Sequence, residues 1–424
     1  MALMNEDFVA AQLEVVRPLA PKFYEREDSL GSRMLKSTAV SQSTRDLRIP
    51  LPIRPGGKFR YMNFNGGDFG LGSGEQLEVA KLAPIEFGVA YEITDRVIFA
   101  TDSPQKSAVN AVNRSVAMAM DEFKNYVDGA LQGGGTGIVA YVDAGYAGGD
   151  TVAFTLPFYA QNLREGGTYS VFSSTQGTYR GTIDLETLDL PNGQATFTAG
   201  QAAAVGLVAG DVLTNEGLTA TPPVGPYGLR YHHNNATSGL WLNVDRATYP
   251  QARTPTVDAQ DSIFTQTHVQ SLIARMEMAL GQDMFEGGKW AWFMHPGQLL
   301  QYMEQHITVQ ELTLRDGGAA NGNVDIVQQR KALAKIHGIP VIQSIHASRE
   351  DVDLINFDVW LRGTYKEVGL HPIGNSTKFP RVSQTGSYGG GYLFFITCAM
   401  QFAMENPRLG GHIENLTERA DLND

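Results

Sequence analysis

The sequence predicts an α+β protein made of several successive parts, and three observations support this. Residues 103–132 carry apolar side chains at steps of three and four, the pattern of one long amphipathic helix. Residues 138–255 contain no lysine and alternate short apolar runs with turn residues, which is typical of an all-β unit. From Asp261 onward, helical and strand patterns alternate, which indicates a mixed α/β domain.

The length, net charge and cysteine content of the chain limit the classes of protein to which it could belong. A chain of 424 residues is too long for one compact core, so we expect two or three domains. The net charge of −12 argues against a protein that coats itself in nucleic acid, because phosphate contacts need basic clusters. The single cysteine, Cys398, excludes an intramolecular disulfide framework and suits a reducing cytoplasm. We find no secretory signal and no apolar run long enough to span a bilayer, so we expect a soluble intracellular product.

The N-terminal segment has the composition of an arm. Residues 8–16 predict a short amphipathic helix that ends before Pro18. Residues 29–44 are rich in serine, threonine and small side chains, with few large apolar groups to anchor them. We expect this stretch to extend over the surface of something else, and a disordered tail is the alternative.

Residues 49–99 predict a long β-ribbon. Residues 59–64 alternate as a first strand, residues 66–74 form a glycine-rich tip, and residues 75–82 run back as the second strand until Pro84. A two-stranded ribbon is marginal in water, so we expect a neighbouring copy of the chain to supply its supporting surface. A dinucleotide loop at residues 70–74 is rejected, because no helix follows it.

The long helix at residues 103–132 has clear end signals. Ser103 is a good N-cap, Pro104 suits the first turn, and Gly133–Gly135 stop the helix. About thirty residues give a rod of about 45 Å. The side opposite the apolar stripe is polar and includes Asp128, so we expect it to face water or a polar partner.

Residues 138–255 predict an all-β insertion, either a small barrel or a sandwich. Its expected strands are residues 168–172, 180–185, 194–198 and 211–213. The His232–His233 pair could suggest a metal site. No cysteine or further histidine lies nearby in sequence, so we expect exposed loop histidines and no metal.

The C-terminal part predicts alternating helices and strands. Asp261 or Ser262 would cap a helix, with Ile263 among its inward residues, and residues 290–294 form a buried strand. Further expected elements are a helix from Pro296 that buries Leu299, Leu300 and Met303, a helix at 328–337, and strands at 339–343, 353–361 and 391–404. The tail from Asn415 is polar and expected to be loose.

No motif for catalysis stands out. The sequence has no Gly-x-Ser-x-Gly elbow, no Walker loop, no His-Glu-x-x-His pair and no Cys-x-x-Cys pair. We therefore expect a protein that is not an enzyme and needs no cofactor.

The order of arm, glycine-tipped ribbon, long helix, β insertion and α/β domain resembles the major capsid proteins of tailed double-stranded DNA phages, the Hong Kong 97-type capsid fold. The stretches that carry the resemblance are Arg48–Ile53, Gly66–Gly74, Thr101–Pro104 and Phe293–Pro296. It implies an N-terminal arm at 1–48, an extended loop at 49–86, a peripheral domain at 87–137 with the spine helix, an insertion at 138–255, a return to the peripheral domain at 256–284, an axial domain at 285–400 and a C-terminal strand and tail at 401–424.

The resemblance implies a function in assembly. Copies of the chain would form hexamers and pentamers that close into an icosahedral virion shell, assembled in the host cytoplasm around double-stranded DNA that it binds without sequence specificity. A portal and a separate scaffolding protein are expected partners, and a decoration protein is a further one. The candidate subunit-interface residues are Arg45, Arg48, Arg54, Lys58, Phe59, Arg60, Tyr61, Phe69 and Lys81, and those of a flexible axial loop are Asp316, Gly317, Gly318, Asn321 and Gly322.

Five basic residues are expected to contact acidic groups of adjacent subunits, with a solvated basic run as the alternative: Arg45, Arg48, Arg54, Lys58 and Arg60. We predict that no covalent crosslink forms, because Lys58 and Lys81 lie on the stems of the ribbon without a clear apolar pocket. Two alternative functions remain: an encapsulin-type compartment shell with the same fold, and a carbohydrate-active or carbohydrate-binding protein built around the β insertion.

Overall fold

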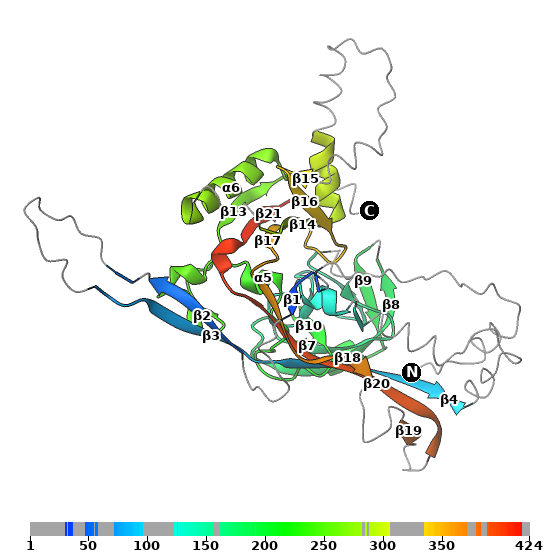
Figure 1. Ribbon diagram of the computed structural model, residues 1–424. Helices are drawn as coiled ribbons and strands as arrows, with labels where there is room; N and C mark the ends of the chain where they lie inside the picture. The colour runs from blue at the N-terminus through cyan, green and yellow to red at the C-terminus, as the bar shows by residue number, and fades with distance from the viewer. Residues whose placement is uncertain are drawn as a thin grey trace, which may run out of the picture.

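The computed structural model describes much of the chain and has a mixed α+β architecture with many strands and few helices (Figure 1). The predicted fold class is confirmed. Within the described part, no helix is long and apolar enough to cross a bilayer. The described residues are 30–31, 33–36, 47–54, 56–57, 72–95, 123–124, 126–156, 162–190, 192–281, 285, 288–305, 335–370, 379–382 and 388–417.

A central five-stranded sheet is organised by the longest strand, β20 (Tyr388–Met404). Antiparallel partners of β20 are β18 (Trp360–Leu370), β19 (Phe379–Val382) and β4 (Ile85–Thr94), and β1 (Leu35–Lys36) runs parallel to β18. Phe394, Ile396 and Cys398 are buried at alternate positions, as expected for a strand with one face on a core. The strand predicted at 391–404 is confirmed. β4 had been assigned to the ribbon, and it lies in this sheet instead.

A second, six-stranded sheet forms the upper layer in Figure 1. Its strand order is β13 (Thr256–Ser262), β21 (Gly411–Leu416), β17 (Val352–Asn356), β14 (Trp290–Met294), β16 (Ile339–Gln343) and β15 (Lys335–Ile336). All five residues of β14 are buried, which fits a central strand covered on both faces. The helix α6 (Gln266–Leu280) packs on this core through Val269, Leu272 and Met276.

Four predictions for this layer were wrong in detail. The last residues of the expected helix 328–337 are not helical: Lys335–Ile336 form a strand that is joined to β16 by a two-residue turn at His337 and Gly338. Both turn residues have positive φ (52° and 79°), as the twist of a tight hairpin requires. Residues 328–334 lie outside the described residues.

The helix ends also differ. Thr265 caps α6 through a capping box, in place of Asp261 or Ser262. Ile263 is exposed and the neighbouring Phe264 is fully buried, because the helix starts three residues later than expected. Residues 296–305 are helical as predicted and bury Leu299 and Met303, whereas Leu300 is partly exposed.

The β insertion is a closed barrel of six strands. Its order is β5 (Ile138–Tyr141), β10 (Val212–Asn215), β7 (Thr168–Phe172), β8 (Tyr179–Asp189), β9 (Gln194–Phe197) and β6 (Thr151–Ala153). The circle closes where Val142 bridges Phe154 and the backbone N–H of Thr155 donates to Tyr141 O at 3.0 Å. Alternate residues such as Val171, Ile183 and Leu185 fill the interior, together with Ala202 of the short helix α4 (Gln201–Ala204).

Residues 216–255 leave the barrel and return to the body of the molecule. They contain α5 (Leu229–His232), β11 (Leu240–Trp241), β12 (Val244–Asp245) and the 3-10 turn η2 (Pro250–Ala252), which lies near η4 (Pro407–Leu409). Trp241 is fully buried beneath the ribbon. The insertion is therefore shorter than the predicted 138–255.

The predicted domain limits also differ from the sheets at the C-terminal end. Strands β18 and β20, placed in the axial domain at 285–400, belong to the central sheet. Strand β13, placed in the return segment at 256–284, pairs with β21, so residues 256–262 and 411–416 lie side by side in the upper sheet. The chain thus crosses between the two sheets several times.

Only the end of the long helix is described. Residues 123–124 and 126–130 are helical, Phe123 and Leu131 are buried, and the chain turns at Gln132 before the predicted glycines. Residues 101–122, which hold most of the predicted spine, lie outside the described residues, as do the predicted helix at 8–16 and the arm beyond residue 36.

Candidate subunit interface

The ribbon consists of β2 (Leu47–Arg54) and β3 (Gln76–Leu82), and it projects from one side of the body (Figure 1). The predicted returning strand is confirmed. The first strand lies at 47–54 in the structure, and residues 58–71, which include the predicted strand 59–64, are outside the described part.

One face of the ribbon is supported by the chain's own body. Ile49, Leu51, Ala80 and Leu82 are buried on this inner face. They pack on Trp241, Leu242 and Val244 of the β11–β12 hairpin, and the backbone N–H of Lys81 donates to Leu242 O at 3.0 Å. The expectation that only a neighbouring copy could support the ribbon was therefore wrong for its base.

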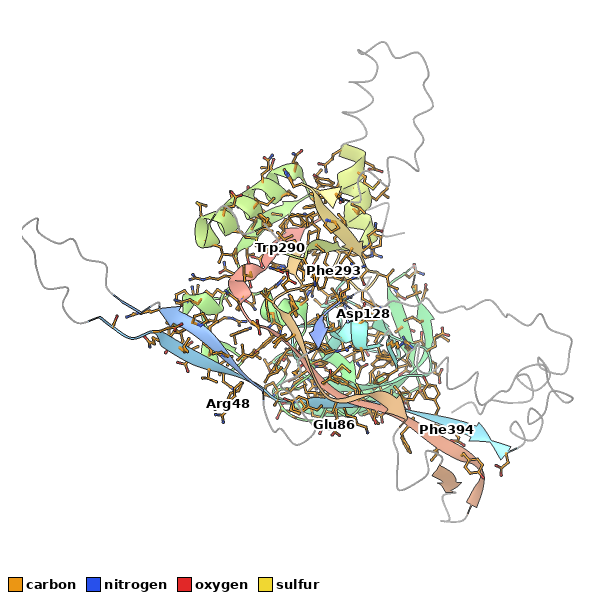
Figure 2. The ribbon with its side chains drawn as sticks, viewed as in Figure 1. Arg48, Glu86, Asp128, Trp290, Phe293 and Phe394 are labelled. Carbon is orange, nitrogen blue, oxygen red and sulfur yellow. The ribbon has the colours of Figure 1, made fainter. Side chains whose placement is uncertain are left out.

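The other face of the ribbon is exposed, and we call it the outer face. Its members share a position that points away from the body and are Arg48, Pro50, Pro52, Leu77, Val79 and Lys81. Leu77 and Val79 are 50% and 41% exposed, which is high for large apolar side chains on adjacent positions of one strand face. Arg48 lies directly opposite Lys81 at the base, and Arg54 lies at the far end. Figure 2 shows Arg48 projecting from the base of the ribbon.

Two prolines on β2 protect its free edge. The N–H of Lys81 points away from β2, so in an antiparallel ladder the backbone nitrogen of the opposite Arg48 also points away from β3. The same orientation recurs two and four residues on, at Pro50 and Pro52. Neither proline removes a bond of the ladder, and both remove a donor from the open edge. The ribbon is therefore suited to contact through its face and poorly suited to the addition of a further strand on β2.

Only three of the predicted interface residues are among the residues that the structure describes. Arg48, Arg54 and Lys81 are all exposed. The structure brings Arg48 and Lys81 together on the outer face, whereas a shift in register after Pro52 places Arg54 opposite Gln76 at the end of β2. Arg45, Lys58, Phe59, Arg60, Tyr61 and Phe69 lie outside the described residues, and so do the axial-loop residues 316–322. The contact of these residues with a neighbour stays a prediction.

The start of the arm does not rest on another molecule. Leu30 and Met34 are 0% and 5% exposed, and both pack into the core of the same chain. Asp128, at the end of the long helix, accepts hydrogen bonds from the N–H of Leu30 at 2.9 Å and of Gly31 at 3.4 Å. Figure 2 places Asp128 in the interior. The polar side of that helix therefore has a polar partner here, and the expectation of an external surface was wrong for residues 30–36.

The histidines expected in an exposed loop are buried. His232 is fully enclosed by aromatic rings of Tyr231, Trp241 and Trp360. Trp241 Nε1 can only donate, so its 3.0 Å contact makes His232 Nδ1 an acceptor and leaves Nε2–H to donate to Phe402 O at 3.1 Å. Burial lowers the pKa of His232 to about 3, so its ring stays neutral.

His233 belongs to a buried network that local sequence does not reveal. Its Nδ1 lies 2.8 Å from Asp353 Oδ1, and His412 Nδ1 lies 2.8 Å from the same oxygen. On its other side His412 faces Asp351 at 3.9 Å, and Asp351 pairs with Arg230 at 2.8 Å. Burial acts to lower the pKa of His412, but the carboxylates of Asp353, Asp351 and Glu414 together outweigh it and raise that pKa above its ordinary value. Burial acts to raise the pKa of Asp353, and the two histidines hold it below its usual range.

His233, Asp353 and His412 could also be considered as metal ligands. A tetrahedral zinc ion with bonds of about 2.0–2.1 Å would hold its ligand atoms roughly 3.3 Å apart. The two nitrogens lie instead at hydrogen-bonding distance from one carboxylate oxygen. The geometry fits two N–H donors on a shared acceptor, and we assign the cluster to hydrogen bonding.

The barrel has an acidic composition. Residues 138–216 contain eight acidic residues, two arginines and no lysine. Arg180 pairs with the buried Asp211 at 3.0 Å, and the guanidinium of Arg164 lies 4.3 Å from the ring centre of Tyr126. Both cations of the barrel are thus engaged within the chain.

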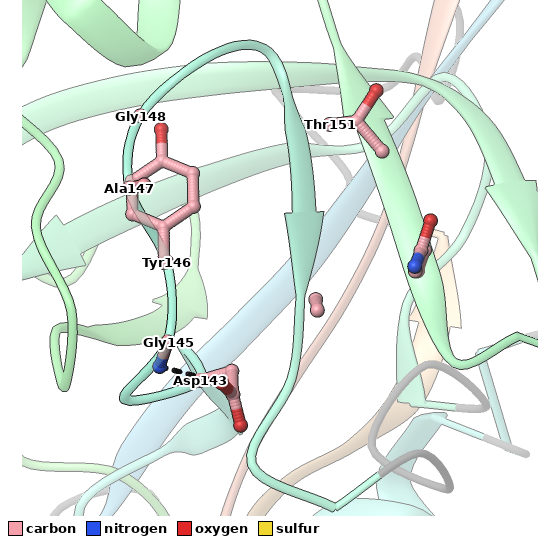
Figure 3. Close-up of a pocket in the computed structure, with 8 residues that line it drawn as sticks. Asp143, Gly145, Tyr146, Ala147, Gly148 and Thr151 are labelled. Atoms are coloured by element: carbon pink, nitrogen blue, oxygen red, sulfur yellow. Dashed lines mark hydrogen bonds between the residues drawn. The ribbon is translucent and has the colours of Figure 1, made fainter.

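A shallow hollow of about 210 Å³ lies beside the β5–β6 loop of the barrel (Figure 3). Two of its polar side chains are already bonded within the loop. Asp143 accepts from the N–H of Gly145 at 2.6 Å, and the hydroxyl of Tyr146 donates to Gly149 O at 2.6 Å. Nothing in this lining points to a particular ligand.

Comparison with known proteins places the fold. No protein-family model and no curated protein matches the sequence. Among solved structures, the capsid asymmetric unit of cyanophage A-1(L) is 13% identical with a TM-score of 0.51, over 94% of this chain and 95% of that one. Two further structures are less similar. The capsid of a native GTA particle is 10% identical with a TM-score of 0.47, over 98% of this chain and 100% of that one. An encapsulin complex from Synechococcus elongatus is 9% identical with a TM-score of 0.45, over 98% of this chain and 96% of that one. The chain therefore has the fold of the cyanophage capsid protein along nearly its whole length.

Proposed function

We propose that this chain is the major capsid protein of a tailed double-stranded DNA phage, a structural protein without catalytic activity. Copies would associate into hexamers and pentamers and close by symmetry into an icosahedral shell. The observation that carries the proposal is the likeness to the cyanophage capsid over 94% of this chain and 95% of that one.

The ribbon provides a physical reason for assembly. Its outer face leaves Leu77 and Val79 in water, although the inner face of the same strands is well packed. Covering about 100 Å² of apolar surface would stabilise a contact by about 2–3 kcal/mol. Such a contact is weak alone and strong when each copy repeats it around a closed ring.

The partners follow from the proposed role. The shell would enclose DNA without sequence-specific contacts, which agrees with a net charge of −12. A portal, a separate scaffolding protein and a decoration protein are the further partners we propose, with assembly in the host cytoplasm and a final place in the virion.

Electron microscopy of the purified chain tests the proposal. We expect hexameric or pentameric rings, or closed shells, in negative stain after expression with the scaffolding protein of the same phage. A folded chain that stays monomeric under these conditions, as shown by light scattering, would contradict the proposal and would favour a binding protein built on the barrel.

The contents of the particle separate the two kinds of shell. A phage capsid isolated from infected cells should protect double-stranded DNA from nuclease. Particles of an encapsulin-type compartment would contain a cargo protein and no protected genome.

A further inference from the structure

The barrel offers a surface that complements the ribbon. Along β8, Ile183 and Leu185 point into the barrel, and Asp184, Glu186 and Asp189 are exposed on the outside. These three carboxylates span about 17 Å along one strand. Among the described residues of the barrel no lysine is present, and both arginines are engaged elsewhere, so this strand presents an acidic face.

The outer face of the ribbon has the opposite charge and a similar length. Its cations Arg48 and Lys81 lie at the base, and the exposed Arg54 ends β2 about 20 Å further along, opposite Gln76 and past a shift in register. The exposed Leu77 and Val79 lie between them. The two surfaces are complementary in charge and both are extended strand faces.

One chain cannot bring its own two surfaces together. The ribbon projects from one side of the body, and β8 and β9 lie on the opposite side (Figure 1). Two different, complementary patches on opposite sides of a subunit make a head-to-tail interface, which closes into a ring when the rotation between copies allows it.

We propose that the outer face of the ribbon of one copy docks on the acidic outer face of β8 in a neighbouring copy. This inference rests on the proposed function and names the surface that the ribbon contacts. The contact is between faces, because Pro50 and Pro52 remove donors from the free edge of β2. Attraction between the opposite charges would also set the orientation of the copies and disfavour ribbon-to-ribbon or barrel-to-barrel encounters.

Carbodiimide coupling of assembled particles tests the contact directly, since the reagent joins a lysine amine to a carboxylate that touches it. We expect an amide link between Lys81 and Glu186 in peptides identified by mass spectrometry. Mixed particles of ¹⁴N- and ¹⁵N-labelled chains show whether a link is between copies. The Lys81→Arg variant keeps the charge and cannot be coupled, so the link should vanish while the particles remain.

Charge exchange provides an independent test. Lys81→Glu and Glu186→Lys should each lower the yield of rings or shells about fivefold or more, and the double variant should recover to within about twofold of the unmodified chain. Glu216→Lys is the matched control, because Glu216 is an exposed carboxylate of the same barrel away from β8. Circular dichroism should show that all four variants fold.

The outcomes separate this inference from the proposed function. Particles in which Lys81 couples only to residues outside the barrel, or in which Glu216→Lys lowers the yield as strongly as Glu186→Lys, would overturn the docking and leave the capsid role intact. A chain that never assembles, with or without substitutions, would instead overturn the capsid role.

Discussion

At the scale of single residues, the buried network of His233, Asp353 and His412 could not be predicted from the sequence. The two hydrogen bonds join residues 120 and 59 positions apart, and no local pattern links them. The adjacent histidines were the only signal. The polar sequence around them predicts an exposed loop and hides that the segment packs beneath Trp360.

The network predicts a pH dependence of stability. The folded pKa of His412 is raised above 6.5, so its contribution is full below that pH and is lost as the pH rises through the folded pKa. The folded pKa of Asp353 lies below 3.8, so its contribution is present above that pH and is lost as the pH falls. We therefore expect the network to stabilise most between about pH 4 and 6.5.

The variant His412→Gln tests this expectation, because glutamine can donate to Asp353 without a charge. The difference in Tm between the unmodified chain and the variant should be largest near pH 5.5 and should shrink toward alkaline pH, as measured by scanning calorimetry. A difference that stays constant from pH 5 to 9 would show that His412 acts through packing only.

Asp128 provides a second prediction at this scale. Asp128→Ala leaves the buried N–H of Leu30 without its acceptor, so we expect a loss of about 1–3 kcal/mol in the free energy of unfolding. Residues 30–36 should also become more sensitive to limited proteolysis. Lys124→Ala, an exposed change on the same helix, is the control and should have little effect on either measurement. Equal effects of the two changes would argue against an anchoring role for Asp128.

At the scale of elements, the sequence was informative where a pattern reflects burial directly. Four of the six barrel strands, β14 and β20 were predicted well, because their apolar residues follow the period of a buried strand, whereas the short β5 and β6 were not predicted. The hairpin at His337–Gly338 was missed, since Lys335 and Ile336 follow good helix formers. Pairing with β16 overrides their local preference.

The two faces of the ribbon predict opposite effects for similar substitutions. Leu51→Ala empties a buried site on the inner face, so we expect about 3 kcal/mol less stability of the subunit. Leu77→Ala changes an exposed site and should alter subunit stability by less than about 1 kcal/mol, while lowering the yield of particles. Denaturant unfolding and sedimentation measure the two effects separately. Normal particle yield in Leu77→Ala would show that the outer face is not an interface.

At the scale of the whole molecule, the arrangement of strands into sheets could not be predicted from the sequence. Strands from distant parts of the chain share a sheet, as β13 and β21 do, so linear boundaries could not describe the domains. The order of parts nevertheless predicted the fold, because that order is preserved along the chain even where the strands interleave.

The last prediction concerns covalent bonds between copies, and we expect none from the ribbon. An isopeptide bond joins a lysine amine to an asparagine amide with loss of ammonia, and it needs the amine to be desolvated and held within reach of the amide. Lys81 is exposed in the single subunit and lies directly opposite a second cation, Arg48. In the proposed interface its partner is the carboxylate of Glu186 and not an asparagine amide. Mature particles boiled in denaturant should therefore run on a gel as one band near 46.2 kDa. Particles of Lys81→Arg should give the same band, whereas a ladder that disappears in this variant would identify Lys81 as a crosslinking residue.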